Sequence, residues 1–272
     1  MAEWNRAKFV RYVANNTDSE QMIAYSSSEV DERKFVDNAC EYLGRFWGTR
    51  LDREYPPAEW MTKERGRPMA IDLVRCKPGE ENKAKKDKDI EIAIEAKFIT
   101  PKEKTDQEAK EERNSIKTGE ISQTPKQIIE DVFRLLSLEN QNIERYLLVG
   151  GRRPAYNKIW EHSILQEMLP REYDNSFGTS NKLAAFFGIS ARYRNNILGS
   201  KKVNLEKWAE KLQKVLADFK ESAPHKINFL NFDVELVAIF CPSGDWVIPE
   251  ENTKDIQCDF IDVRLWQIKP SK

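Results

Sequence analysis

Histidine and cysteine are scarce in this chain of 272 residues, which holds two of the first and four of the second. The cysteines are scattered and form no Cys-x-x-Cys pair, which argues against a disulfide scaffold and a cysteine zinc site. Two histidines are too few for a multi-histidine metal site. Any metal would therefore be bound by oxygen atoms, which are the ligands that Mg²⁺ and Mn²⁺ prefer.

Long apolar segments are also missing. No run reaches the roughly 18 apolar residues of a transmembrane helix, and residues 1–13 lack the apolar segment of a secretion signal. Together with the cysteine pattern, these absences predict a cytoplasmic protein with no membrane partner. Hydrophobic residues still make up 40% of the chain, which is enough for a core and argues against global disorder.

An excess of charge of one sign is absent as well, since 44 Lys and Arg face 45 Asp and Glu. The balance is uneven along the chain, because residues 152–226 contain 14 basic and 8 acidic side chains. A basic block within a neutral protein can mark a nucleic-acid-binding surface, or it can be a set of solvated helix faces. Charge alone leaves both interpretations open.

The first half of the chain has a clear order of secondary structure. Apolar residues recur at helical spacing over 28–47, and again over 122–138, where a proline stands in the first turn. Segments 67–76 and 90–99 have the composition of strands and are predicted to pair as a hairpin, and 145–151 is a third, buried strand. The order helix, strand, strand, helix, strand is typical of a sheet flanked by helices.

The second half is less regular. Strands are predicted over 231–240 and roughly 259–268. We divide the chain into a core, residues 1–155, and a helical and β extension, residues 156–272, which is a candidate for DNA contacts or dimerisation. The pattern leaves open whether this half is a separate domain or continues the same sheet.

The two strands of the predicted hairpin carry ionisable residues in apolar surroundings. Asp72 lies in the first strand, and Glu95 and Lys97 lie two residues apart in the second, so that their side chains point to the same face. Buried charges are costly unless they are paired or bound to metal. If the strands pair, the two carboxylates and the carbonyl of Ala96 offer oxygen ligands to Mg²⁺, and Lys97 can orient or deprotonate an attacking water.

An acidic residue on one strand and Glu-x-Lys on the next, with the surrounding helices and strand, resembles the PD-(D/E)XK nuclease superfamily. The resemblance covers roughly residues 28–151. It implies an α/β protein with a restriction-endonuclease-like core, in which a central mixed sheet is flanked by helices, here followed by a C-terminal α+β extension. It also implies that Asp72 and Glu95 bind one or two Mg²⁺ or Mn²⁺ ions and that Lys97 assists water attack on a phosphodiester.

The sequence departs from the family pattern at two points. Residue 71 is Ile rather than Pro, and a long charged insert separates Asp72 from Glu95. Asp89 or Glu91, which are nearer in sequence to Glu95, are the alternative metal ligands. A different interpretation is that the Glu-x-Lys motif is an ordinary ion pair on a strand surface.

Two further side chains are candidates on the helices. Glu32 continues the apolar stripe of the first helix backwards and could be an additional metal ligand, or it could simply favour the helix N-terminus. Gln127 lies near the N-terminus of the second helix, where phosphates bind readily, although capping and solvation explain it as well.

Residues 180–202 resemble a helix-turn-helix unit with a glycine at its turn. Arg192 and Arg194 in its second helix, and Lys201 and Lys202 after it, are residues of the types that contact bases and phosphates. The alternative is an ordinary helical hairpin with a basic surface.

These observations together predict a Mg²⁺-dependent DNA endonuclease of restriction or defence type that acts on double-stranded DNA. Because cutting both strands requires two active sites, we expect a homodimer. A role in repair and an RNA substrate are alternatives within the nuclease interpretation. A non-catalytic nucleic-acid-binding or assembly protein with a nuclease-like fold is the alternative of a different class.

Overall fold

The computed structural model describes residues 4–17, 28–49, 51–56, 70–80, 83, 89–99, 123–138, 140–152, 165, 168–170, 200–204, 231–240 and 261–271. The helices among them are α1 (Arg6–Thr17), α2 (Ser28–Trp47) and α4 (Gln123–Leu136). The strands are β1 (Asp52–Tyr55), β2 (Ile71–Cys76), β3 (Ile90–Ile99), β4 (Glu144–Arg152), β5 (Ser200–Asn204), β6 (Asn231–Phe240) and β7 (Ile261–Ser271). None of these helices has the length and apolar character needed to span a membrane.

The strands form one mixed sheet of seven, in the order β1-β2-β3-β4-β7-β6-β5. Only β3 and β4 are parallel neighbours, and α4 lies between them in the chain, as a parallel connection requires. All other neighbouring strands are antiparallel. The prediction of an α/β protein with a helix-flanked sheet is therefore confirmed at the level of a general α/β fold.

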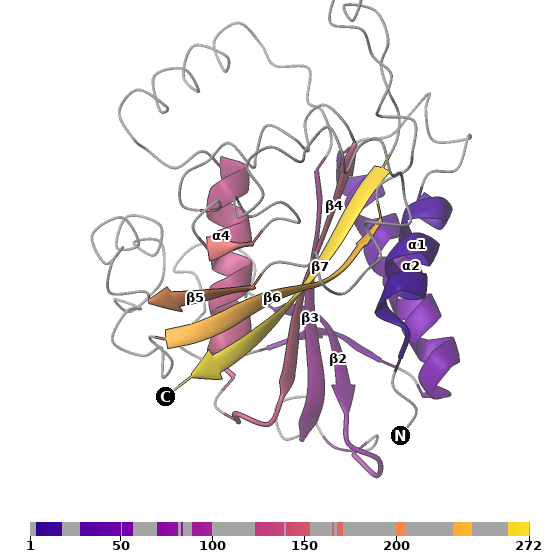
Figure 1. Ribbon diagram of the computed structural model, residues 1–272. Coiled ribbons are helices and arrows are strands. Elements are labelled where there is room, and N and C mark those ends of the chain that lie inside the picture. Colours follow the sequence, from indigo (N-terminus) through magenta and orange to yellow (C-terminus); the bar gives the residue numbers. More distant parts are fainter. Residues whose placement is uncertain are drawn as a thin grey trace, which may run out of the picture.

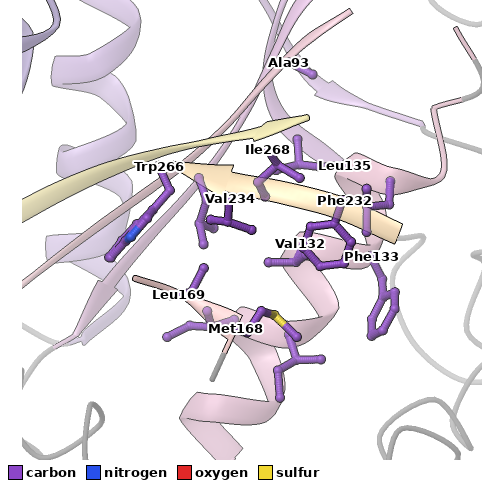
Figure 2. Packing of buried hydrophobic residues seen from close by; sticks show 14 of the residues in the cluster. Ala93, Val132, Phe133, Leu135, Met168, Leu169, Phe232, Val234, Trp266 and Ile268 are labelled. Carbon is purple, nitrogen blue, oxygen red and sulfur yellow. The ribbon is translucent and has the colours of Figure 1, made fainter. Parts of the chain in front are cut away.

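Helices cover the two faces of the sheet (Figure 1). The pair α1 and α2 lies on one face, where it encloses a core with β3, β4 and β7. On the other face, α4 closes a second core. Figure 2 shows Val132 of α4 beside Val234 of β6 and Ile268 of β7 in this second core. The strongly amphipathic pattern of α4 is thus explained by burial of its apolar side against the sheet.

The predicted hairpin forms. Strand β2 pairs with β3 in antiparallel register, with Leu73 opposite Ile94. Continued by one residue, the same register puts Asp72 opposite Glu95. Residues directly opposite each other in an antiparallel pair point to the same face, so the pairing alone brings the two carboxylates together.

The strands of the second half continue the sheet of the first half. Strand β7 pairs with residues Arg145 to Arg152 of β4, and β6 and β5 follow β7 to the edge of the sheet. The side chain of Trp266 on β7 is fully buried, and its indole N–H donates a hydrogen bond to the carbonyl of Pro170 at 2.8 Å. Strands from both parts of the predicted division therefore share one hydrogen-bonded sheet.

A fully buried arginine holds the connection between α4 and β4. The guanidinium of Arg145 donates to four carbonyl oxygens at 2.6–2.9 Å, those of Leu135, Leu138, Asn140 and Ile143. Carbonyls at the end of a helix lack partners within the helix, and a positive charge there also complements the helix dipole. Arg145 therefore satisfies carbonyls at the end of α4 and along its connection to β4.

Strand β4 runs through Gly150 and continues to Arg152, and this glycine has a packing role. A Cβ at position 150 would lie 2.5 Å from the buried ring of Phe35 and 3.2 Å from the ring of Phe98. We expect Gly150→Ala to lower the free energy of unfolding by about 1–3 kcal/mol, measured by urea denaturation, because this side chain cannot be accommodated without moving the core. Gly44→Ala is the control, since its Cβ would make only an ordinary contact at 3.5 Å and alanine favours helix α2. Equal stability of Gly150→Ala and wild type would contradict this account.

Candidate active site

The centre of the candidate site is the carboxylate pair of Asp72 and Glu95. Asp72 is half-buried at the start of β2, and Glu95 is completely buried in the middle of β3. The backbone N–H of Ala96 donates a hydrogen bond of 2.8 Å to Oδ2 of Asp72. This bond fixes one carboxylate beside the other across the strand pair.

Both carboxyl groups are harder to ionise than usual. Burial raises the pKa of Asp72 from 3.8 to about 6, against the opposing effect of the Ala96 N–H. Burial also raises the pKa of Glu95 well above its ordinary value, and the negative charges of Asp72 and Asp131 raise it further. Two acids kept close together in a low-dielectric setting are typical of functional sites.

Helix α4 brings two more charged side chains to this pair. Nε of Arg134 lies 2.9 Å from Oε1 of Glu95, and the guanidinium also forms an ion pair with Asp131 one turn earlier in the helix. Asp131 is buried, and 17% of the Arg134 side chain is exposed. Neither Asp131 nor Arg134 was predicted from the sequence. The available signal was that Asp131 lies three residues after Ile128, on the side of the helix that faces the core.

Lys97 and Glu32 form a second, adjacent pair. Nζ of Lys97 lies 2.8 Å from Oε1 and 3.1 Å from Oε2 of Glu32 on α2. Strand β2 begins at Ile71 and does not extend beside Lys97. Within the described residues, the end of β3 from Lys97 onwards therefore has no paired strand along its β2 edge. Glu32 can therefore reach Lys97 from α2. Glu32, the candidate for an additional metal ligand, thus contacts Lys97 in the structure.

The charges of the site do not balance among the described residues. Lys97 and Glu32 neutralise each other, but Asp72, Glu95 and Asp131 share only the guanidinium of Arg134. Three carboxylates and one guanidinium carry a formal charge of −2 when all are ionised. One divalent cation would neutralise this charge, so the charge balance fits the predicted Mg²⁺ or Mn²⁺.

The site offers few protein ligands to such a metal ion. No group of three or more His, Cys, Asp or Glu is placed to hold a metal ion in the part of the chain that the structure describes. A cation would thus depend on two carboxylates, Asp72 and Glu95, with the Ala96 carbonyl and water, as Mg²⁺ sites commonly do. Oε1 of Glu95 lies 2.9 Å from Nε of Arg134, so a cation bound at Glu95 would share this carboxylate with the guanidinium.

The alternative ligands lie elsewhere. The carboxylate of Asp89 is 3.1 Å from Nζ of Lys77, and that of Glu91 is 3.5 Å from Nε of Arg75. Each has a basic partner of its own, and Asp72 is the acid that stands opposite Glu95.

The predicted nucleic-acid contacts are spread over the molecule. Gln127 is half-buried in the first turns of α4. Lys201 and Lys202 lie on the edge strand β5, four strands away from β3 in the sheet, where Lys202 is exposed. Arg192 and Arg194 fall outside the described residues. So does the helix-turn-helix prediction for 180–202, except for residues 200–202, which belong to strand β5.

Comparison with known proteins adds no relative: no family model, no curated protein and no solved structure matches the chain.

Proposed function

We propose that this protein is a divalent-cation-dependent endonuclease that hydrolyses phosphodiester bonds in double-stranded DNA, with a restriction-endonuclease-like core of the PD-(D/E)XK type. The observation that supports this most is the placement of three residues. Asp72 and Glu95 stand opposite each other on adjacent strands, both with a raised pKa, and Lys97 follows on the same face of β3. In biological terms, this is a cytoplasmic restriction or defence enzyme.

Each residue has a distinct role in this proposal. Asp72 and Glu95, with the Ala96 carbonyl, hold Mg²⁺ or Mn²⁺. When bound, this cation supplies charge stabilisation to the phosphoryl oxygens and makes water a better nucleophile. Lys97, held by both oxygens of Glu32, presents an N–H donor that orients the attacking water or the scissile phosphate.

The substrate and the assembly follow from the chemistry of the reaction. Two lysines, Lys201 and Lys202, and the basic block over 152–226 provide charge for phosphate contacts. Simultaneous cleavage of both strands of a duplex needs two active sites, so we propose a homodimer as the active form.

Plasmid cleavage tests the proposal directly. Wild-type protein with millimolar Mg²⁺ or Mn²⁺ is expected to cut, and Glu95→Gln is expected to lose cleavage because one of two metal-binding carboxylates becomes neutral. Glu91→Gln is the matched control, since it removes a carboxylate from the same strand that pairs with Arg75 instead. It is expected to cut like wild type. Gel electrophoresis of the products measures all three.

The products also refine the conclusion. Discrete fragments would indicate a site-specific nuclease, and nicks or smears a nuclease without sequence specificity. Failure of the wild type to cut either DNA or RNA would contradict the proposal.

A second candidate function is a non-catalytic nucleic-acid-binding protein that uses the same fold. The complete burial of Glu95 and its contact with Arg134 favour it, because they also describe a structural charge cluster. Such a protein would bind DNA with a strong salt dependence and without regard to added metal, whereas the nuclease would lose Mn²⁺ binding in Glu95→Gln.

A further inference from the structure

Arg134 occupies an unusual place in the candidate site. It reaches from α4 to the carboxylate pair on the sheet, and it is the only cation among the described residues that contacts Glu95. Asp131 holds its guanidinium from one turn earlier in the same helix. The side chain thus joins the helix to the middle of β3.

The contact between Arg134 and Glu95 is a charge contact without hydrogen-bond geometry. Nε of Arg134 and Oε1 of Glu95 are 2.9 Å apart, yet Nε has no acceptor in hydrogen-bond geometry within the described segments. A directed bidentate pair would be strong and difficult to exchange. The contact between Arg134 and Glu95 lacks this directed geometry, so another cation could take the place of the guanidinium at Glu95 while Asp131 retains it.

We propose that Arg134 is the resident counter-charge of the Asp72–Glu95 pair and that it competes with the divalent cation for Glu95, with Asp131 as its alternative partner. The inference rests on the proposed metal site and adds to it a residue that sets the affinity for metal. The physical reason is that a guanidinium beside Glu95 both repels an incoming cation and occupies one of its ligands.

Titration calorimetry with Mn²⁺ alone tests this without relying on activity. We expect Arg134→Gln to bind Mn²⁺ at least about tenfold more tightly than wild type at pH 8, because one positive charge next to the site is gone. Arg134→Lys keeps the charge and is expected to stay within a few-fold of wild type. Asp131→Asn is expected to bind Mn²⁺ several-fold more weakly than wild type. Of the two carboxylates that contact the guanidinium of Arg134, only Glu95 then remains, so Arg134 competes more strongly with the metal.

The double variant Asp131→Asn with Arg134→Gln removes one charge of each sign and leaves the formal charge of the cluster unchanged. It is therefore less prone to misfold than Arg134→Gln alone. Competition for Glu95 predicts tighter Mn²⁺ binding in this double variant than in wild type. A purely long-range charge effect predicts equal binding. Far-UV circular dichroism confirms that each variant is folded before titration.

The outcomes separate this inference from the proposed function. Mn²⁺ binding by wild type with no gain in Arg134→Gln or in the double variant would overturn the role of Arg134 and leave the nuclease proposal standing. Binding by neither wild type nor any variant would remove the metal site and both proposals. Binding that appears only when Arg134 is replaced would support competition most directly.

Discussion

Replacement of Lys97 by methionine is expected to reduce DNA cleavage by about 10²–10⁴-fold, the usual effect of removing a group that positions or transfers a proton at the reacting centre. Methionine keeps the length and much of the volume of the side chain, so the strand should remain in place. The loss would come from the missing N–H donor, which both oxygens of Glu32 now hold at 2.8 and 3.1 Å. Initial rates of plasmid cleavage measure the effect.

Two further measurements identify the cause of this loss. Mn²⁺ binding in Lys97→Met should remain within a few-fold of wild type, because the proposed ligands are Asp72 and Glu95. Lys269→Met is the matched control: Lys269 also forms an ion pair from a strand to a carboxylate, 2.9 Å from Glu235, but on β7 and more exposed. It should cleave like wild type. Cleavage by Lys97→Met at the wild-type rate would remove Lys97 from the mechanism.

Replacement of Asp72 by asparagine is expected to stabilise the protein at pH 8, without divalent cations, by about 3 kcal/mol. Burial raises the pKa of Asp72 to about 6 from 3.8. Between about pH 4 and pH 6, the folded protein retains a proton that the unfolded chain has released. The free energy of unfolding therefore falls as pH rises through this window, and the stability present below it is lost.

Asparagine avoids this loss because it is neutral at every pH and its side-chain oxygen can still accept the N–H of Ala96. Urea denaturation in EDTA from pH 4 to pH 8 should show the two proteins nearly equal at pH 4 and diverging above it. Asp89→Asn, at an exposed ion pair with Lys77, should follow the wild-type curve within about 0.5 kcal/mol. A constant difference between Asp72→Asn and wild type at all pH values would show that the site does not impose this cost.

Local pattern predicted the regular elements of this fold well. The helix 28–47 and the strands 90–99 and 231–240 have the predicted bounds, because each shows a clean helical or alternating repeat of apolar residues. Helix α1 and strands β1 and β5 were not predicted. Strand β1 has four residues, too few to show a period, and α1 is amphipathic only weakly, since charged residues interrupt its apolar stripe.

Some residues of the candidate site could be predicted from the sequence and others could not. Asp72, Glu95 and Lys97 could be grouped from the sequence because a hairpin relates two neighbouring strands by a simple register and alternation assigns their faces. Arg134 and Asp131 could not be placed, since a helix that crosses over a sheet brings its residues to positions that no local repeat specifies.

The amino-acid sequence by itself determined whether a segment forms a helix or a strand, and it determined the hairpin of β2 and β3. Through this hairpin it also determined that Asp72 lies beside Glu95 and Lys97. Each of these features depends on residues close together in the chain. The tertiary structure alone decided that β7 pairs with β4 and so joins both halves in one sheet. It also decided that Arg134 contacts Glu95 and that Glu32 holds Lys97. These contacts join residues 39 or more positions apart in sequence, and only the packing of helices onto the sheet brings them within reach.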